Sequence, residues 1–170
     1  GQFARMYDPD QVPGFARDEQ DLQRKPPEYR LYMRRPEHKF RGFAEAGEPA
    51  FRAMKAAYYG MVSQIDWKIG ELLDTLHARN LMERTIVVFT SDHGEFLGDH
   101  GICAKAPFLL DCMLHVPFAI RFPGAAPHRL PDLAESVDLF PTLAELAELP
   151  VPPWVQGRSF AGEIRGDGRA

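Results

Sequence analysis

The residues best suited to chemistry lie within the fourteen positions from 92 to 105. Asp92 and His93 open this segment, a second Asp-His-Gly triplet occupies 99–101, and Lys105 follows. A carboxylate is a hard oxygen ligand for divalent cations, and an imidazole nitrogen is a second kind of metal ligand. A lysine ammonium beside such a pair can neutralise a tetrahedral anion or its leaving oxygen. This pattern suits a metal ion together with an anion.

Each of these residues also has an ordinary structural explanation. Aspartate and glycine are routine turn residues after a strand, and most lysines are solvated at the surface. The repeated triplet and the lysine close behind it favour one shared loop site over those explanations. For His100, a supporting role in the loop is favoured over direct contact with a leaving group.

The elements that must position this segment follow an α/β pattern. Apolar residues spaced by three and four predict a long helix over 50–78, and Gly60 and Gly70 within it indicate close packing. Two continuous apolar runs, 85–90 and 116–122, predict strands of one parallel sheet, each buried on both faces and covered by the helix. Ligands of open α/β sheets bind at the carboxyl ends of strands, which is where Asp92 and His93 are expected.

The remaining segments frame this core. Asn80 is a plausible stop for the long helix, and residues 136–149 predict a second helix, with the tail from 150 as loop. Residues 1–49 are rich in proline and predict an extended, linker-like segment with short turns, before an α/β portion over 50–170.

Composition narrows the classes of function. The net charge of −4 excludes the broad basic surface of a nucleic-acid binder, and the chain lacks the run of about 20 apolar residues that a membrane span needs. Cys103 and Cys112 do not make a disulfide framework, and buried or half-buried thiols are expected. The compartment stays open, with a cytoplasmic and a periplasmic location both possible.

Several short motifs stand along the chain in a fixed order. They are Tyr59-Gly60-Met61-Val62 through Asp66, Thr90 to Glu95, Leu97 to Gly101, Lys105, Val116-Pro117 through Arg121 to Gly124, Asp138 to Leu143, and Gln156 to Ser159. In this order and spacing, over about residues 50–160, the chain resembles the type I sulfatases of the alkaline-phosphatase superfamily, which also holds phosphonate monoester hydrolases. The resemblance implies part of an alkaline-phosphatase-like mixed or parallel sheet flanked by helices.

The resemblance also implies a mechanism and a set of partners. In such enzymes a divalent cation, usually Ca²⁺, orients the sulfate or phosphonate and a formylglycine made from the first residue of Cys/Ser-x-Pro-x-Arg. By position, Asp92 and His93 match the metal-ligand pair, and Lys105 matches the lysine that binds sulfate oxygens. The imidazole makes Mg²⁺ or Mn²⁺ harder to exclude. The substrate class implied is a sulfate ester or phosphonate ester, as a small molecule or a glycan.

The departures from the family pattern shape the interpretation. No Cys/Ser-x-Pro-x-Arg motif occurs, and the family's paired aspartates and upstream histidine are absent. Ala104 stands where glycine usually precedes the lysine, which is a mild change. We interpret the chain as the C-terminal part of a sulfatase catalytic domain that is inactive without its nucleophile-bearing N-terminal part. A phosphonate or phosphate ester hydrolase, and a non-catalytic remnant acting as a binding module, are the alternatives.

Overall fold

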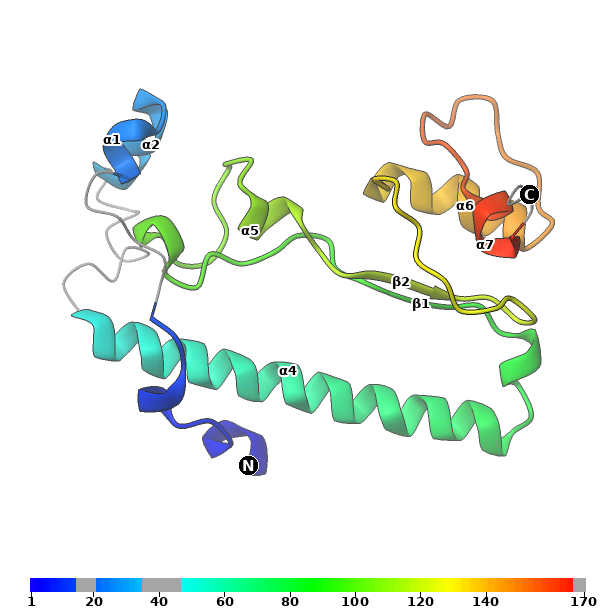
Figure 1. The fold of residues 1–170 in the computed structure, drawn as a ribbon, viewed down its shortest axis with the longest axis horizontal. Coiled ribbons are helices and arrows are strands. Elements are labelled where there is room, and N and C mark those ends of the chain that lie inside the picture. The colour runs from blue at the N-terminus through cyan, green and yellow to red at the C-terminus, as the bar shows by residue number, and fades with distance from the viewer. Residues whose placement is uncertain (15–20, 35–46, 167–170) are drawn as a thin grey trace. The chain divides into compact units, whose positions relative to one another are not determined.

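The computed structural model describes residues 1–14, 21–34 and 47–166 (Figure 1). The described chain forms two compact units. The first joins Gly1–Thr75 to His93–Val116, and the second joins Leu76–Asp92 to Pro117–Ala170. The chain passes from one unit to the other between Asp92 and His93, so the predicted metal-ligand pair lies at that crossing.

The long helix predicted over 50–78 is confirmed as α4, Gly47–Ala78 (Figure 1). It ends where Asn80 takes a left-handed conformation, with φ at 54°. The Leu81 N–H then donates to the Leu76 carbonyl at 2.9 Å, and the Asn80 N–H donates to the His77 carbonyl at 3.0 Å. These two bonds are the Schellman ending, in which the last carbonyls of a helix find donors just past its end.

The two glycines of α4 differ. A side chain at Gly60 would collide with the Phe3 carbonyl, so glycine lets the N-terminal segment lie directly on the helix. The close packing predicted at Gly60 is confirmed. The hydroxyls of Tyr7 and Ser63 share a hydrogen bond of 2.8 Å, and Arg52 donates to the Val12 carbonyl at 2.6 Å, which fixes the same segment. Around Gly70 the described chain has nothing within 4 Å of the corresponding position, so the close packing predicted there is wrong.

Part of the segment predicted as extended is helical. The described residues form the 3-10 turns η1 (Gln2–Arg5) and η2 (Pro9–Gln11) and the helices α1 (Asp21–Arg24) and α2 (Pro27–Arg34). Pro27 begins α2 at the position where a helix needs no N–H donor, so proline starts this helix rather than breaking it. Residues 15–20 and 35–46 of the predicted linker lie outside the described residues. The division of the chain at residue 49 stays a prediction.

The two predicted strands form one sheet. β1, Val87–Thr90, pairs with β2, Phe118–Arg121, with Val87 opposite Arg121. The pairing is antiparallel, so the predicted parallel arrangement is wrong for these two strands, because a continuous apolar run does not determine strand direction. Phe89 is 47% exposed, so β1 is not buried on both faces within this chain. Packing of α4 against the sheet stays a prediction.

The second unit ends in helices. The predicted helix over 136–149 is confirmed in outline as η6 (Ser136–Asp138) and α6 (Leu139–Leu146). The tail predicted as loop contains α7, Ala161–Arg165, whose Ile164 packs in a buried cluster with Leu146 and Phe160. This long-range burial stabilises a helix too short to be read from periodicity. None of the helices among the described residues is long and apolar enough to cross a bilayer.

Three shorter elements complete the fold: η4 (Met82–Arg84), η5 (Asp99–Gly101) and α5 (Asp111–Leu114). In the second unit Arg121 of β2 donates to the Met82 carbonyl at 2.6 Å and to the Glu83 carboxylate at 3.1 Å. These bonds join the sheet to η4, the turn that precedes β1 and Asp92.

Candidate functional site

The turn after β1 is held by backbone bonds to α5. The Gly94 N–H donates to the Met113 carbonyl at 2.8 Å, and the Glu95 N–H donates to the Cys112 carbonyl at 3.1 Å. A side chain at Gly94 would collide with the Cys112 carbonyl, so only glycine permits this approach. The backbone that follows His93 is therefore fixed by α5 in the first unit.

The structure brings His93 and Lys105 together, as their sequence pattern predicted. The His93 Nδ1 lies 2.7 Å from the Gly94 carbonyl, which can only accept, so Nδ1 carries the proton. The lone pair is then on Nε2, which lies 3.5 Å from the Lys105 ammonium nitrogen. A protonated Nδ1 held by a backbone carbonyl, with the lone pair on Nε2, is the tautomer that metal-binding histidines use. The metal and anion roles themselves stay predictions.

The loop between the two residues has an unusual backbone. Leu97, His100 and Ala104 have φ of 48°, 57° and 58°, and Gly98 has φ of 98°. Left-handed conformations are rare outside glycine and cluster at functional loops. At Ala104, where the resemblance implies glycine, the left-handed conformation costs an alanine about 1 kcal/mol.

A small apolar core supports this loop. Phe96 and Ile102 are fully buried, and they pack with Phe108, Met113 and Tyr29. Sequence reasoning missed Tyr29 and Phe108 as parts of this structure. Phe108 lies in an apolar stretch just after Lys105, which was a usable signal, whereas Tyr29 lies far upstream and gave none.

Cys103 and Cys112 are both thiols. Cys103 is buried and Cys112 is half-buried, as predicted. Burial raises the pKa of the Cys112 thiol above its ordinary value, and the negative charge of Asp99 raises that pKa further. The thiol therefore stays protonated at neutral pH, and a protonated thiol is a poor nucleophile.

The donors for a metal ion are few. Across residues 1–14, 21–34 and 47–166, no three His, Cys, Asp or Glu side chains gather closely enough to hold a cation. Asp92 and His93 are adjacent in the chain and offer one carboxylate and one imidazole, whereas Ca²⁺ takes 6 to 8 oxygen ligands. This pair fits a cation as part of a coordination shell and not as the whole of it.

Another family motif, around Asp138, is structural. The two carboxylate oxygens of Asp138 accept from the Arg158 N–H at 2.7 Å and the Glu135 N–H at 3.0 Å. The Thr142 hydroxyl donates to the Asp138 carbonyl at 2.7 Å and accepts from the Phe160 N–H at 3.2 Å. These backbone donors, Glu135 first, lower the pKa of Asp138 below its ordinary value. We call this set of bonds the Asp138 latch.

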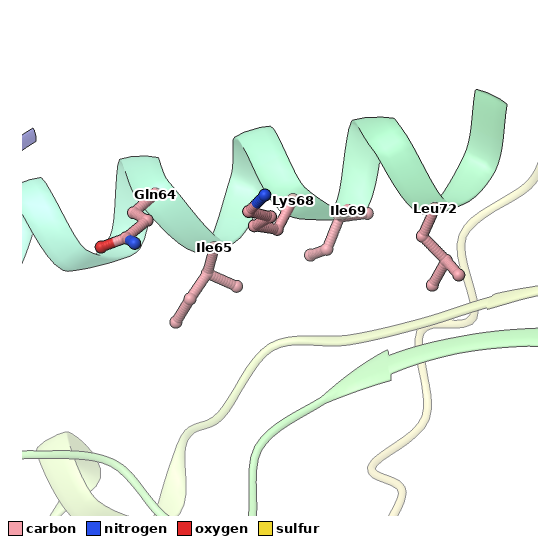
Figure 2. Close-up of a pocket in the computed structure, with 5 residues that line it drawn as sticks. All are labelled: Gln64, Ile65, Lys68, Ile69 and Leu72. Atoms are coloured by element: carbon pink, nitrogen blue, oxygen red, sulfur yellow. The ribbon is translucent and has the colours of Figure 1, made fainter. Parts of the chain in front are cut away.

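An open groove on α4 lies apart from this chemistry. It measures about 350 Å³ and is lined by Gln64, Ile65, Lys68, Ile69 and Leu72 (Figure 2). The Lys68 ammonium pairs with the Glu71 carboxylate at 2.8 Å. The lining is otherwise apolar or a neutral amide, so the groove offers no acid, base or nucleophile.

The sulfatase family model matches residues 7–149. The chain belongs to the sulfatase family. It is 37% identical over 124 residues to the choline-sulfatase of Rhizobium meliloti (strain 1021), which covers 70% of this chain and 24% of that protein.

Solved structures agree with that assignment. The phosphonate monoester hydrolase from Silicibacter pomeroyi is similar over 99% of this chain and 34% of its own, with 30% identity and a TM-score of 0.86. A sulfatase structure from Bacteroides thetaiotaomicron, described as putative, is similar over 93% of this chain and 36% of its own, with 27% identity and a TM-score of 0.75. The alkaline-phosphatase-like fold class is therefore confirmed, and the chain spans about a quarter to a third of these relatives.

Proposed function

We propose that this chain forms the cation- and anion-binding side of a sulfuric ester hydrolase whose nucleophile lies in another part of the protein. The observation that carries the proposal is the approach of His93 Nε2 to the Lys105 ammonium, on a loop that α5 fixes, in a member of the sulfatase family. A neutral imidazole and a cation meeting at one exposed point suit a site that takes a metal ion and an oxyanion together.

Each residue then has a definite task. Asp92 would give a carboxylate oxygen to a divalent cation, and His93 would give the nitrogen whose orientation the Gly94 carbonyl fixes. Lys105 would neutralise the charge on the sulfate oxygens. The cation, Ca²⁺ or in its place Mg²⁺ or Mn²⁺, would supply further positive charge to the ester. Splitting the displacement into two steps requires a covalent nucleophile, which we assign to a formylglycine in the rest of the protein.

Phosphonate or phosphate ester hydrolysis is the second candidate. The observation that favours it is the extent of similarity to the phosphonate monoester hydrolase from Silicibacter pomeroyi, which takes in 99% of this chain. Both reactions use a tetrahedral anion, a cation and a lysine, so Asp92, His93 and Lys105 would serve either.

The test compares a sulfate monoester and a phosphonate monoester of the same nitrophenol, hydrolysed by the full-length protein with its formylglycine verified by mass spectrometry. We expect higher kcat/KM for the sulfate, and a loss of turnover in Asp92→Ala that added Ca²⁺ partly restores. A preference for the phosphonate would transfer the assignment to the second candidate. Absence of turnover on both esters, with formylglycine present, would support the non-catalytic remnant.

A further inference from the structure

The apolar core beneath the Lys105 loop is completed by a residue from far upstream. Tyr29 of α2 is 9% exposed, and its ring stacks on Phe108 with centroids 3.6 Å apart and planes 12° apart. Tyr32, one turn later on the same helix, meets Phe108 edge to face at 5.0 Å. Phe108 is thus held by two rings of one helix, one stacked on its face and one meeting it edge to face.

Phe108 is one of two anchors on either side of Lys105. On the N-terminal side Ile102 and Cys103 are 1% and 3% exposed. On the C-terminal side Phe108 is 9% exposed, and its N–H donates to the Ala106 carbonyl at 2.8 Å in a tight turn. Ala104 and Lys105 are exposed between these anchors. The direction of the Lys105 side chain therefore depends on how Cys103 and Phe108 are placed at the two ends of this short segment.

The same core also reaches the histidine. Met113 packs in the cluster with Tyr29 and Phe108, and its carbonyl accepts the Gly94 N–H that follows His93. One apolar cluster therefore supports the backbone beneath His93 and the backbone beside Lys105. Loss of its upstream member would loosen the Lys105 side first, because Tyr29 stacks directly on Phe108.

We propose that Tyr29 is a positioning residue for the anion site, acting through Phe108 on Lys105. The proposal rests on the anion-binding function proposed for Lys105. It adds that α2, which lies in the segment predicted to be linker-like, sets the affinity of the site for oxyanions. Tyr29 touches neither substrate nor metal in this account. Its contribution is to keep the lysine ammonium beside His93.

The first test is a double-mutant cycle in the full-length enzyme, with inhibition by inorganic sulfate as the readout. We expect Tyr29→Ala to weaken sulfate inhibition about tenfold, which corresponds to about 1.4 kcal/mol, and to raise KM more than it lowers kcat. Tyr29→Phe keeps the stacked ring and should restore inhibition. In the Lys105→Ala background, Tyr29→Ala should have no further effect, because both changes weaken the same interaction between Lys105 and sulfate. Additive effects would overturn the proposal.

A matched control and an activity-independent readout complete the test. Tyr7→Ala removes a tyrosine that contacts α4 through Ser63 and Tyr59, and it should leave sulfate inhibition unchanged. Hydrogen exchange should accelerate in residues 102–110 of Tyr29→Ala while α6 stays protected. Hydrogen exchange can be measured even if the enzyme hydrolyses neither ester. Absence of hydrolysis would refute the proposed function and would leave the positioning role to be decided by the exchange rates. Unchanged exchange in 102–110 would refute the positioning role; if Tyr29→Ala does not fold, Tyr29→Leu carries the same expectation.

Discussion

Two regions built from sulfatase motifs use their polar residues in opposite ways. In the Asp138 latch the aspartate is 9% exposed, and each of its carboxylate oxygens accepts a backbone N–H. In the loop His93–Val116 the Lys105 side chain is exposed and approaches His93 Nε2 at a long 3.5 Å. The backbone also differs, because the loop has non-glycine residues in left-handed conformations whereas η6 is bounded by extended and right-handed ones.

From this contrast we expect the motif around Asp138 to hold the fold and the motif around Lys105 to perform chemistry. An aspartate whose oxygens are filled by the chain's own N–H groups has little capacity left for a cation. A lysine at the surface beside a neutral imidazole can accept an anion without first losing a strong internal bond. The comparison therefore predicts that changes in the loop affect turnover and changes in the latch affect stability.

The largest effect is expected from Lys105→Ala in the full-length enzyme. Removal of a preorganised charge from a developing anion lowers kcat/KM by about 10²- to 10³-fold. The thermal unfolding midpoint should stay within the error of the wild-type value, because the side chain is exposed. Steady-state kinetics with an aryl sulfate measures the first quantity and calorimetry the second. Lys68→Ala, which removes a lysine paired with Glu71 on α4, is the control and should change neither.

Asp138→Ala should give the opposite result. Loss of two charge-assisted hydrogen bonds that leaves two part-buried N–H groups without their partner is expected to cost about 1–3 kcal/mol of stability, measured by urea unfolding. Catalytic constants of the protein that remains folded should be close to wild type. Asp132→Ala, at an exposed aspartate of the same unit, should be neutral. A catalytic defect in Asp138→Ala without a loss of stability would break the comparison.

The latch should also respond to pH. Because the folded-state pKa of Asp138 is lowered, its contribution to stability is complete above the ordinary aspartate pKa of about 3.9 and is lost as the pH falls through the folded value. The stability difference between wild type and Asp138→Asn should therefore shrink between neutral pH and about pH 3. Thermal midpoints measured across that range test the sign. A difference that grows toward acid pH would contradict the latch.

The smallest effect concerns the loop backbone. Ala104 has φ of 58°, a conformation that glycine adopts without steric cost, so Ala104→Gly should stabilise the protein by up to about 1 kcal/mol. Ala106→Gly, a glycine introduced two residues further on at a position without positive φ, should destabilise instead. Equal shifts in unfolding midpoint for the two variants would show that the strain at Ala104 is absent in solution.

The sequence predicted those parts of the fold that depend on residues close together in the chain. The helix α4 and its end near Asn80 were predictable, because helix periodicity and a left-handed helix ending depend on residues close together in the sequence. The direction of β2 relative to β1 was not, since antiparallel and parallel buried strands share one composition. The roles of α7 and of Tyr29 depend on partners far away in the chain, which periodicity cannot reveal.

The same distinction holds for the candidate site. The meeting of His93 and Lys105 was predictable because one short loop joins them. The tautomer of His93 and the anchoring of Phe108 required the positions of the Gly94 carbonyl and the Tyr29 ring. Residue types thus indicated which chemistry to expect, and the support beneath it came from long-range contacts.

The central claim is that this chain holds one side of an active site and needs the rest of the protein to act. The most direct measurement is aryl sulfate hydrolysis by the 170-residue chain alone and after co-expression with the N-terminal part and a formylglycine-generating system. We predict turnover at background for the chain alone, and turnover in the co-expressed complex that Lys105→Ala lowers by about 10²- to 10³-fold. Turnover by the isolated chain that disappears on Asp92→Ala would contradict the account and require a nucleophile within these residues.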